Sequence, residues 1–420
     1  MVVERDNLLD DKGLPKKPLR LSKLPFLMRK RAINFMSFGE RIRLAVASDD
    51  MENYVKESRL DKYIHWTLKI CDSSSSIIIY EGKVEVAVTD NFPAGDMEGD
   101  KIPKREIAKW CDDKKEPIEN VKVILKKLQD LLTGSLKPQE ICLDLNVAEQ
   151  KILEILTAPV YKDANELHFR NFRLEKKTID AIMEICEFKK IAIFINLIFP
   201  HDYYHEKALK CEKILFNDAK WMRVTQLLTL RDLSYVYLCH TSLDSEDFDF
   251  FVKFWTTVDY DMCKEIWINT RDEQRTPVLH NIGTLNVVGF DEVAAMFTRD
   301  VAEKFYLVMS KSKNPAKKLQ IAVIQIVNYA FYMKVRPVED FKNLVTILNL
   351  VQLKNDKEIA LENLEIEAQL DSWEEDEIEE NTRGLRIEKQ ELEQRLMNLN
   401  VQFDGKQARL VREPAPAVVE

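Results

Sequence analysis

The chain has 420 residues, of which 45% are apolar and 32% are charged, and its formal net charge is −9. This length and composition support two or three folded units with a buried core and exclude a fully disordered protein. The mild acidity argues against nucleic-acid binding by the protein as a whole and favours protein partners.

Targeting and redox features are sparse. The first thirty residues are charged, and no stretch approaches the ~18–20 apolar residues that a membrane span requires. We therefore expect no membrane contact and a cytoplasmic or nuclear location. The seven cysteines form no CxxC pair, so they predict reduced, mostly buried thiols and neither a metal knuckle nor a redox dithiol.

The N-terminal part changes character twice. Residues 1–18 are mostly polar and predict a disordered tail. From about Pro25, apolar residues recur at roughly helical spacing as far as Ala47, which predicts a small helical hairpin or three-helix unit. Residues 64–90 then carry short apolar runs separated by serines and a glycine, so they predict three short antiparallel strands.

A repeat dominates the middle of the chain. Short apolar strands, separated by helical stretches, are expected at residues 141–145, 167–169, 191–195, 214–216, 235–238 and 266–268. Four of them end before an asparagine, at Asn146, Asn196, Asn217 and Asn269. One strand and one helix per unit predict a leucine-rich-repeat-like solenoid with a parallel sheet, although the asparagine spacing differs from the standard repeat.

Helices are expected in the C-terminal third. Apolar residues between Leu319 and Phe331 follow an i, i+3, i+4 pattern behind Asn314-Pro315, and a second helix opens at Pro337. These two helices are expected to close the end of the solenoid. An acidic segment from Glu362 to Glu380 predicts a single long helix rather than a coiled coil, followed by a disordered end.

The usual markers of catalysis are missing. None of the ten glycines falls into GxxxxGK[ST], GxGxxG or GxSxG. His201 and His205 have the spacing of a ligand pair on a helix, but they lack a third ligand, and His168 and His240 are better explained as turn residues than as general bases. We therefore expect no enzymatic activity, no cofactor and no metal.

Two charged segments leave alternatives open. The basic residues between Lys16 and Arg43 suit solvated helix faces or an acidic protein partner better than nucleic acid. The acidic run around Trp373 is explained by solubility more readily than by a basic partner.

Residues 24–48 resemble the F-box of a large nematode family. The resemblance rests on Leu24-Pro25-Phe26-Leu27, Ile33, Met36-Ser37-Phe38, Glu40-Arg41-Ile42-Arg43-Leu44 and Ala47-Ser48. A second stretch resembles the type-2 F-box-associated domain through Leu227-Leu228-Thr229-Leu230, Tyr235–Leu238, Ser242-Leu243, Asp247, Phe250-Phe251, Trp255 and Glu265–Ile268. The order of the two domains also fits that family.

This resemblance implies a substrate-recognition adaptor of a cullin-type (SCF) ubiquitin ligase. Its F-box would bind a Skp-type adaptor, itself bound to the cullin, and its repeat-like domain would bind an unknown protein substrate. The implied adaptor-binding residues are Leu24, Pro25, Phe26, Met28, Phe38 and Ile42, although Ile42 also suits the core of a small helical domain. Because Asp49-Asp50 stand where the family usually has basic residues, the alternative is a repeat-type protein-binding scaffold with a degenerate F-box and no ligase role.

The expected fold class is therefore α/β, with F-box helices, short antiparallel strands, a solenoid and C-terminal helices. The expected boundaries are 1–18 tail, 19–58 F-box, 59–119 strand-rich connector, 120–290 F-box-associated repeat-like domain, 291–356 helical cap, 357–402 acidic helix and 403–420 disordered tail.

Overall fold

The structure is a computed structural model, and it forms two compact units. The first unit comprises residues 1–147 and 158–164, and the second comprises residues 148–157 and 165–420. Within them the structure describes residues 21–58, 64–70, 75–79, 83–89, 99–132, 136–144, 149–158, 164–170, 173–186, 189–270, 279, 282–287, 293, 296–297, 305–327, 330–370 and 375–410. The expected tail at 1–18 lies outside these residues.

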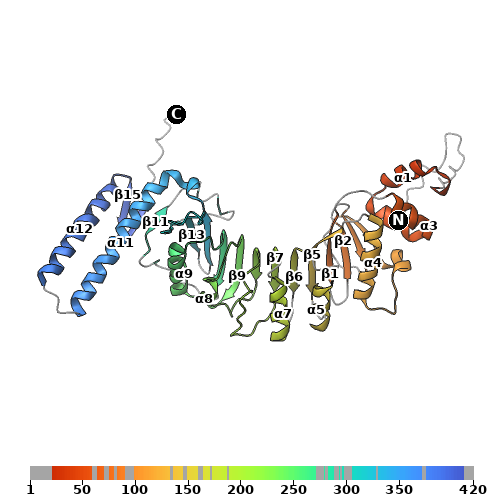
Figure 1. Ribbon diagram of the computed structural model, residues 1–420, viewed down its shortest axis with the longest axis horizontal. Coiled ribbons are helices and arrows are strands. Elements are labelled where there is room, and N and C mark those ends of the chain that lie inside the picture. Colours follow the sequence, from red (N-terminus) through yellow and green to blue (C-terminus); the bar gives the residue numbers. More distant parts are fainter. Residues whose placement is uncertain are drawn as a thin grey trace, which may run out of the picture. The chain divides into compact units, whose positions relative to one another are not determined.

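The first unit opens with helices, as predicted. After a short 3-10 turn, η2 (Leu21–Lys23), come α1 (Phe26–Asn34), α2 (Phe38–Ala47) and α3 (Asp49–Glu57), drawn in red in Figure 1. Ser37 caps α2 by accepting a hydrogen bond from the Glu40 backbone N–H, and the Glu40 side chain bonds back to the Ser37 N–H. The interruption in the apolar pattern at residues 37–39 is this cap.

A small mixed sheet completes the first unit. Its strands are β1 (Ile64–Ile70), β2 (Ser75–Ile79), β3 (Val84–Ala87), β4 (Asp100–Ile102) and β5 (Leu136–Asp144), with η3 (Lys104–Trp110) and α4 (Pro117–Leu132) between β4 and β5. The antiparallel pairing of β1 with β2 and of β2 with β3 confirms the predicted three strands. β5 then adds to β1 in parallel, and β4 adds to β3 in parallel.

The second unit begins with strands that alternate with helices, with one exception. These elements are α5 (Glu149–Thr157), β6 (Glu166–Arg170), α7 (Lys176–Cys186), β7 (Ile191–Ile195), β8 (Lys213–Phe216), α8 (Val224–Leu227), β9 (Tyr235–Thr241), α9 (Ser245–Thr257) and β10 (Glu265–Thr270). The exception is that β8 follows β7 directly among the elements described. Strands β6 to β10 pair in parallel, each with the next along the chain. The predicted α/β class with recurring strand–helix pairs is therefore confirmed for this segment.

Two side-chain ladders connect successive strands of this parallel sheet. Phe169, Phe194 and Phe216 lie in register on β6, β7 and β8, with ring centroids 5.4 and 4.8 Å apart and nearly parallel planes. At the strand ends, the Asn217 Nδ2 donates to Asn196 Oδ1 at 3.0 Å, and Asn196 adopts a φ of 56°. Asparagine tolerates this left-handed conformation better than most non-glycine residues, which accounts for the asparagine at position 196.

Most strand pairs in the remainder of the second unit are antiparallel. The elements of this part are β11 (Thr284–Val287), β12 (Phe305–Met309), β13 (Ile321–Val327), β14 (Ala330–Arg336), η4 (Val338–Phe341), α11 (Lys342–Leu370), α12 (Glu375–Met397), β15 (Val401–Asp404) and β16 (Gln407–Leu410). β14 pairs antiparallel with β10, and the order continues through β13, β12, β11 and β16 to β15, whereas β11 and β16 pair in parallel. α11 covers β11 and β12 over a buried apolar cluster.

The predicted helix at 319–331 is wrong, and with it most of the helical cap expected at 291–356. The segment forms β13 and β14, because five consecutive residues from Ile321 to Gln325 are buried on both faces of the sheet. A strand buried on both faces shows no alternation, so its apolar run also satisfies helical spacing. Asn314 caps no helix; its Oδ1 accepts a hydrogen bond from the Ala316 N–H in a turn.

The C-terminal predictions are confirmed only in part. The helix expected after Pro337 exists as α11, but the acidic segment forms two helices rather than one, and α11 and α12 run side by side (Figure 1). A disordered tail was expected at residues 403–420, but residues 401–410 form the β15–β16 hairpin. Residues 411–420 lie outside the described part of the chain.

Candidate protein-docking surface

The most exposed cluster of large apolar side chains in the first unit lies on and just after α1. Phe26, Leu27 and Met28 occupy its first turn and are 50%, 72% and 56% exposed, and Phe35 just past its end is 89% exposed. Only Ile33 of this helix is buried. We call these four exposed side chains, Phe26, Leu27, Met28 and Phe35, the α1 patch; groups of exposed large apolar side chains are a common mark of interaction sites.

Polar contacts fix α1 on α3 while leaving the patch free. The Arg29 guanidinium lies 3.8 Å from the ring centroid of Tyr54 and 3.6 Å from a carboxylate oxygen of Glu57, both on α3. The side of α1 that carries Arg29 therefore packs on α3. Exposed basic residues Lys23 and Arg31 lie at the edge of the α1 patch, so a partner with an acidic rim would complement it.

The helices are also tied to the rest of the first unit by buried and half-buried ion pairs. Arg43 on α2 donates two hydrogen bonds to Asp100, at 2.6 and 2.8 Å, and one to Glu106 at 2.5 Å. The Arg43 hydrogen bonds hold the pKa of Asp100 below its ordinary value. Gly39 makes room for this contact, because a Cβ at that position would lie 1.8 Å from Asp100 Oδ2.

A second group of ion pairs joins α3 to α4. Glu52 is buried and accepts hydrogen bonds from Lys127 on α4 at 2.7 Å and from Lys56 at 2.8 Å. Burial alone would raise the pKa of Glu52, but these two ammonium groups outweigh it and the pKa is lowered. The α1 patch is thus presented by a helical group fixed at several points.

The six residues expected to bind the adaptor fall into three environments. Pro25, Phe26 and Met28 are exposed, and Leu24 and Phe38 are half-buried. Ile42 is 0% exposed and belongs to the core between the helices. As a surface contact Ile42 is therefore wrong, because no partner reaches it in the folded unit.

Two exposed residues were missing from that expectation. Leu27 and Phe35 are the most exposed members of the α1 patch. The three consecutive apolar residues at 26–28 indicated exposed apolar side chains on this helix, because the buried face of one helix cannot hold three neighbours in sequence.

Asp49 and Asp50, which depart from the family pattern, have a local explanation. They lie in the first turn of α3, where Ser48 caps the helix by accepting from the Met51 N–H at 3.2 Å. Carboxylates are favourable at a helix N-terminus, and Asp49 also forms an ion pair with Lys109.

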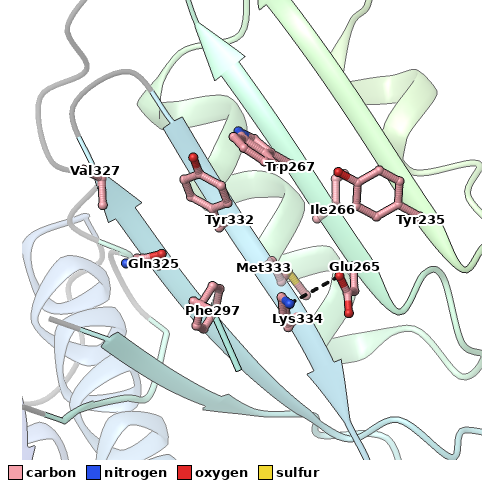
Figure 2. Close-up of a pocket in the computed structure, with 10 residues that line it drawn as sticks. All are labelled: Tyr235, Glu265, Ile266, Trp267, Phe297, Gln325, Val327, Tyr332, Met333 and Lys334. Atoms are coloured by element: carbon pink, nitrogen blue, oxygen red, sulfur yellow. Dashed lines mark ion pairs between the residues drawn. The ribbon is translucent and has the colours of Figure 1, made fainter. Parts of the chain in front are cut away.

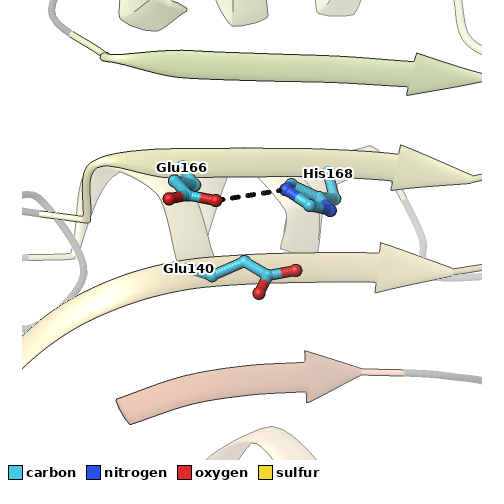
Figure 3. A group of neighbouring side chains, drawn as sticks. All are labelled: Glu140, Glu166 and His168. Atoms are coloured by element: carbon cyan, nitrogen blue, oxygen red, sulfur yellow. Dashed lines mark ion pairs between the residues drawn. The ribbon is translucent and has the colours of Figure 1, made fainter. Parts of the chain in front are cut away.

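The histidines singled out by the sequence form separate contacts. His205 Nε2 lies 3.4 Å from Glu184, whereas His201 Nδ1 lies 3.5 Å from Arg223. On β6, His168 Nε2 lies 3.6 Å from Glu166 Oε2, as Figure 3 shows. His240 lies within β9 with a φ of 51°, at the point where the register between β9 and β10 shifts, and so is a bulge residue of the strand.

Buried ionisable groups in the second unit have structural partners. Lys317 donates to the backbone carbonyls of Trp255 and Val258 at 2.6 and 2.9 Å, so it satisfies the C-terminal end of α9. Burial lowers the pKa of Lys317 to about 8. Burial also raises the pKa of Cys211 and of Cys263 to about 12, which disfavours the reactive thiolate.

Comparisons with protein-family models, curated proteins and solved structures found no match to this chain. Among the described residues, no helix is both long enough and apolar enough to cross a membrane.

Proposed function

We propose that this protein is a substrate-recognition adaptor of a cullin-type ubiquitin ligase, in which the α1 patch binds a Skp-type adaptor. The main supporting observation is the exposure of Phe26, Leu27 and Met28 in the first turn of α1 and of Phe35 just after its end. A soluble helix gains nothing by exposing four large apolar side chains unless a partner buries them. The link to a Skp-type adaptor rests on the F-box resemblance of residues 24–48.

Target recognition is assigned to the second unit. Its parallel strands β6–β10 with their alternating helices, connected by the phenylalanine and asparagine ladders, support a solenoid-like interpretation. Such an array offers an extended surface for protein recognition. In this account the chain brings a target to the ligase, and the transfer chemistry belongs to other subunits.

A binding titration tests the adaptor assignment. The full chain is titrated with a purified Skp-type adaptor bound to its cullin, and a Leu27→Asp/Phe35→Asp double variant is titrated in parallel. Each substitution replaces an apolar side chain that the adaptor would bury with a carboxylate that has no partner in the interface. We therefore expect the affinity for the adaptor to fall by at least about 30-fold, equivalent to about 2 kcal/mol.

The matched control is Ile366→Asp/Ile387→Asp, which changes two exposed apolar residues on α11 and α12 in the second unit. It should bind like the wild type, and circular dichroism should show all three proteins folded. Undiminished binding by the Leu27/Phe35 variant would remove the α1 patch from the interface. No binding by folded wild type would favour the scaffold without a ligase role.

A further inference from the structure

The sheet of the second unit has two unlike faces between β7 and β14. On one face Val236, Ile266 and Phe331 are buried, and Phe331 stacks on Phe248 of α9 with centroids 4.7 Å apart. Because side chains alternate along a strand, their neighbours Tyr237, Trp267 and Tyr332 point to the opposite face and are only half-buried. We call this opposite side the open face.

A continuous row of apolar side chains crosses the open face. Strand register places one residue from each of five neighbouring strands side by side, in the order Ile193, Leu215, Tyr237, Trp267 and Tyr332. We call these five residues the open-face row. Trp267 contacts both neighbouring rings, with centroids 4.8 Å from Tyr237 and 4.5 Å from Tyr332, and its Nε1 donates to Asn269 at 2.8 Å.

A cavity of about 290 Å³ lies at the Tyr332 end of this row. Figure 2 shows Trp267 and Tyr332 above it and Phe297 at its other side. Phe297 belongs to the apolar cluster that packs beneath α11, so the cavity lies beside the part of the sheet that α11 covers. Its size is close to the lower end for ligand pockets, and an aromatic lining with few polar groups is typical of them.

The charged groups beside the row carry an excess of positive charge. Glu265 in the cavity lies 3.4 Å from Lys334 and 3.3 Å from Arg336, so the three side chains together carry one positive charge. Lys213 adds another, since it is exposed and in register with Tyr235. A ligand that places a carboxylate here is favoured over one that places an ammonium group.

We propose that the open-face row and its cavity bind an extended peptide segment that carries an apolar anchor side chain and adjacent acidic residues. Five strands at ~4.8 Å spacing span roughly 19 Å, which is the length of about six extended residues. The anchor fills the cavity beside Trp267, and the acidic residues pair with Lys334 and Arg336. The inference rests on the proposed function in one respect, because it assigns the target site of the adaptor.

The observations favour peptide over single-stranded nucleic acid. Bases need aromatic or guanidinium planes on which to stack, but Ile193 and Leu215 supply two of the five positions in the row.

The test uses fluorescein-labelled ten-residue peptide pools with a central phenylalanine. One pool carries two glutamates after it, the second carries two lysines there, and both are mixtures of alanine, serine and asparagine elsewhere; a ten-residue oligo-dT is the third probe. Fluorescence anisotropy with the full chain should show saturable binding of the acidic pool with an affinity at least about tenfold above that of the basic pool.

Variants localise the binding. Lys334→Ala/Arg336→Ala should lose the preference for the acidic pool, and Trp267→Ala should weaken binding of both pools about tenfold. Lys253→Ala, on the exposed side of α9 and so on the other side of the sheet, should leave both affinities unchanged. Thermal unfolding checks that every variant is folded.

Three outcomes would overturn the inference: equal affinity for the two pools, tighter binding of oligo-dT, or no saturable binding of either pool by folded wild type. The adaptor titration, carried out on the same protein preparation, shows whether the peptide site alone is wrong or the proposed ligase role is wrong. Adaptor binding without peptide selectivity overturns only this site, and peptide selectivity without adaptor binding overturns only the ligase role.

Discussion

Phe194→Ala is expected to lower the free energy of unfolding of the second unit by about 3–5 kcal/mol. Phe194 is 1% exposed and stacks between Phe169 and Phe216, with the edge of Phe199 also within 6.0 Å. Truncation removes the middle ring of the ladder and leaves a cavity that rigid neighbouring strands cannot fill. Urea denaturation followed by far-ultraviolet circular dichroism measures the loss.

The neighbouring residue provides the matched control. Ile193 is on the same strand but points to the open face, where it is half-buried. Ile193→Ala should therefore cost only about 1 kcal/mol, because less apolar area returns to water and no enclosed cavity forms. Equal losses in the two variants would contradict the assignment of one buried and one open face.

Glu358→Gln is expected to destabilise the packing of α12 on α11 by about 3–5 kcal/mol. Glu358 and Lys354 are both buried on α11, with Lys354 Nζ 2.7 Å from Glu358 Oε1. Lys389 of α12 reaches the same oxygen at 2.9 Å, and Lys354 also donates to the Lys406 carbonyl of the β15–β16 turn at 3.3 Å. Removing the carboxylate charge leaves the buried Lys354 ammonium group with the more distant Glu393 carboxylate, at 3.9 Å, in place of its close counterion.

The same carboxylate gives the wild type a pH dependence. Burial alone would raise the pKa of Glu358, but hydrogen bonds from Lys354 and Lys389 outweigh it, so the pKa lies below its ordinary value of 4.5. A carboxyl with a lowered folded-state pKa adds stability above its unfolded pKa and loses it as the pH falls through the folded value. At pH values below about 4.5 the wild type should therefore lose stability through this group, whereas Glu358→Gln should not.

Hydrogen exchange of the α12 amides at pH 7 and at pH 4 measures both effects. Glu388→Gln is the control, since its ion pair with Lys357 is half-exposed and worth about 0–1 kcal/mol. If Glu388→Gln and Glu358→Gln accelerate α12 exchange equally, the buried charge cluster does not hold the two helices together.

The sequence predicted those strands that had clear boundaries. Strands β6 to β10 lie where the sequence shows short apolar runs bounded by polar residues, and after β7 the left-handed φ of 56° at Asn196 ends the strand. The sequence of β13 and β14 does not show the same clear strand boundaries. Continuous burial from Ile321 to Gln325 removed the alternation that distinguishes a strand from a helix.

This one error also hid the candidate peptide site. Tyr332 and Lys334 were assigned to the region of a helical cap, so nothing placed them beside Trp267 and Glu265 on β10. Antiparallel pairing of β14 with β10 brings Tyr332 opposite Trp267 and Lys334 opposite Glu265. Sequence alone does not supply such pairing, since β10 and β14 are about sixty residues apart and β11, β12 and β13 lie between them in the described part of the chain.

The sequence directed attention to α1, and the structure shows which of the residues there are exposed. The Leu-Pro turn and the resemblance that follows it led to α1, and Pro25, Phe26 and Met28 are exposed there. Periodicity does not tell an apolar residue that packs inward from one that faces a partner, so Ile42 was included although it is core. Leu27 and Phe35 were left out although both are exposed.

The central claim is that α1 forms the contact with a Skp-type adaptor, and hydrogen–deuterium exchange of the full chain with and without saturating adaptor tests it most directly. We predict slower exchange of the backbone amides of residues 26–36, while the α7 amides at 176–186 in the second unit exchange at unchanged rates. Unchanged exchange across α1 at saturating adaptor would contradict the claim.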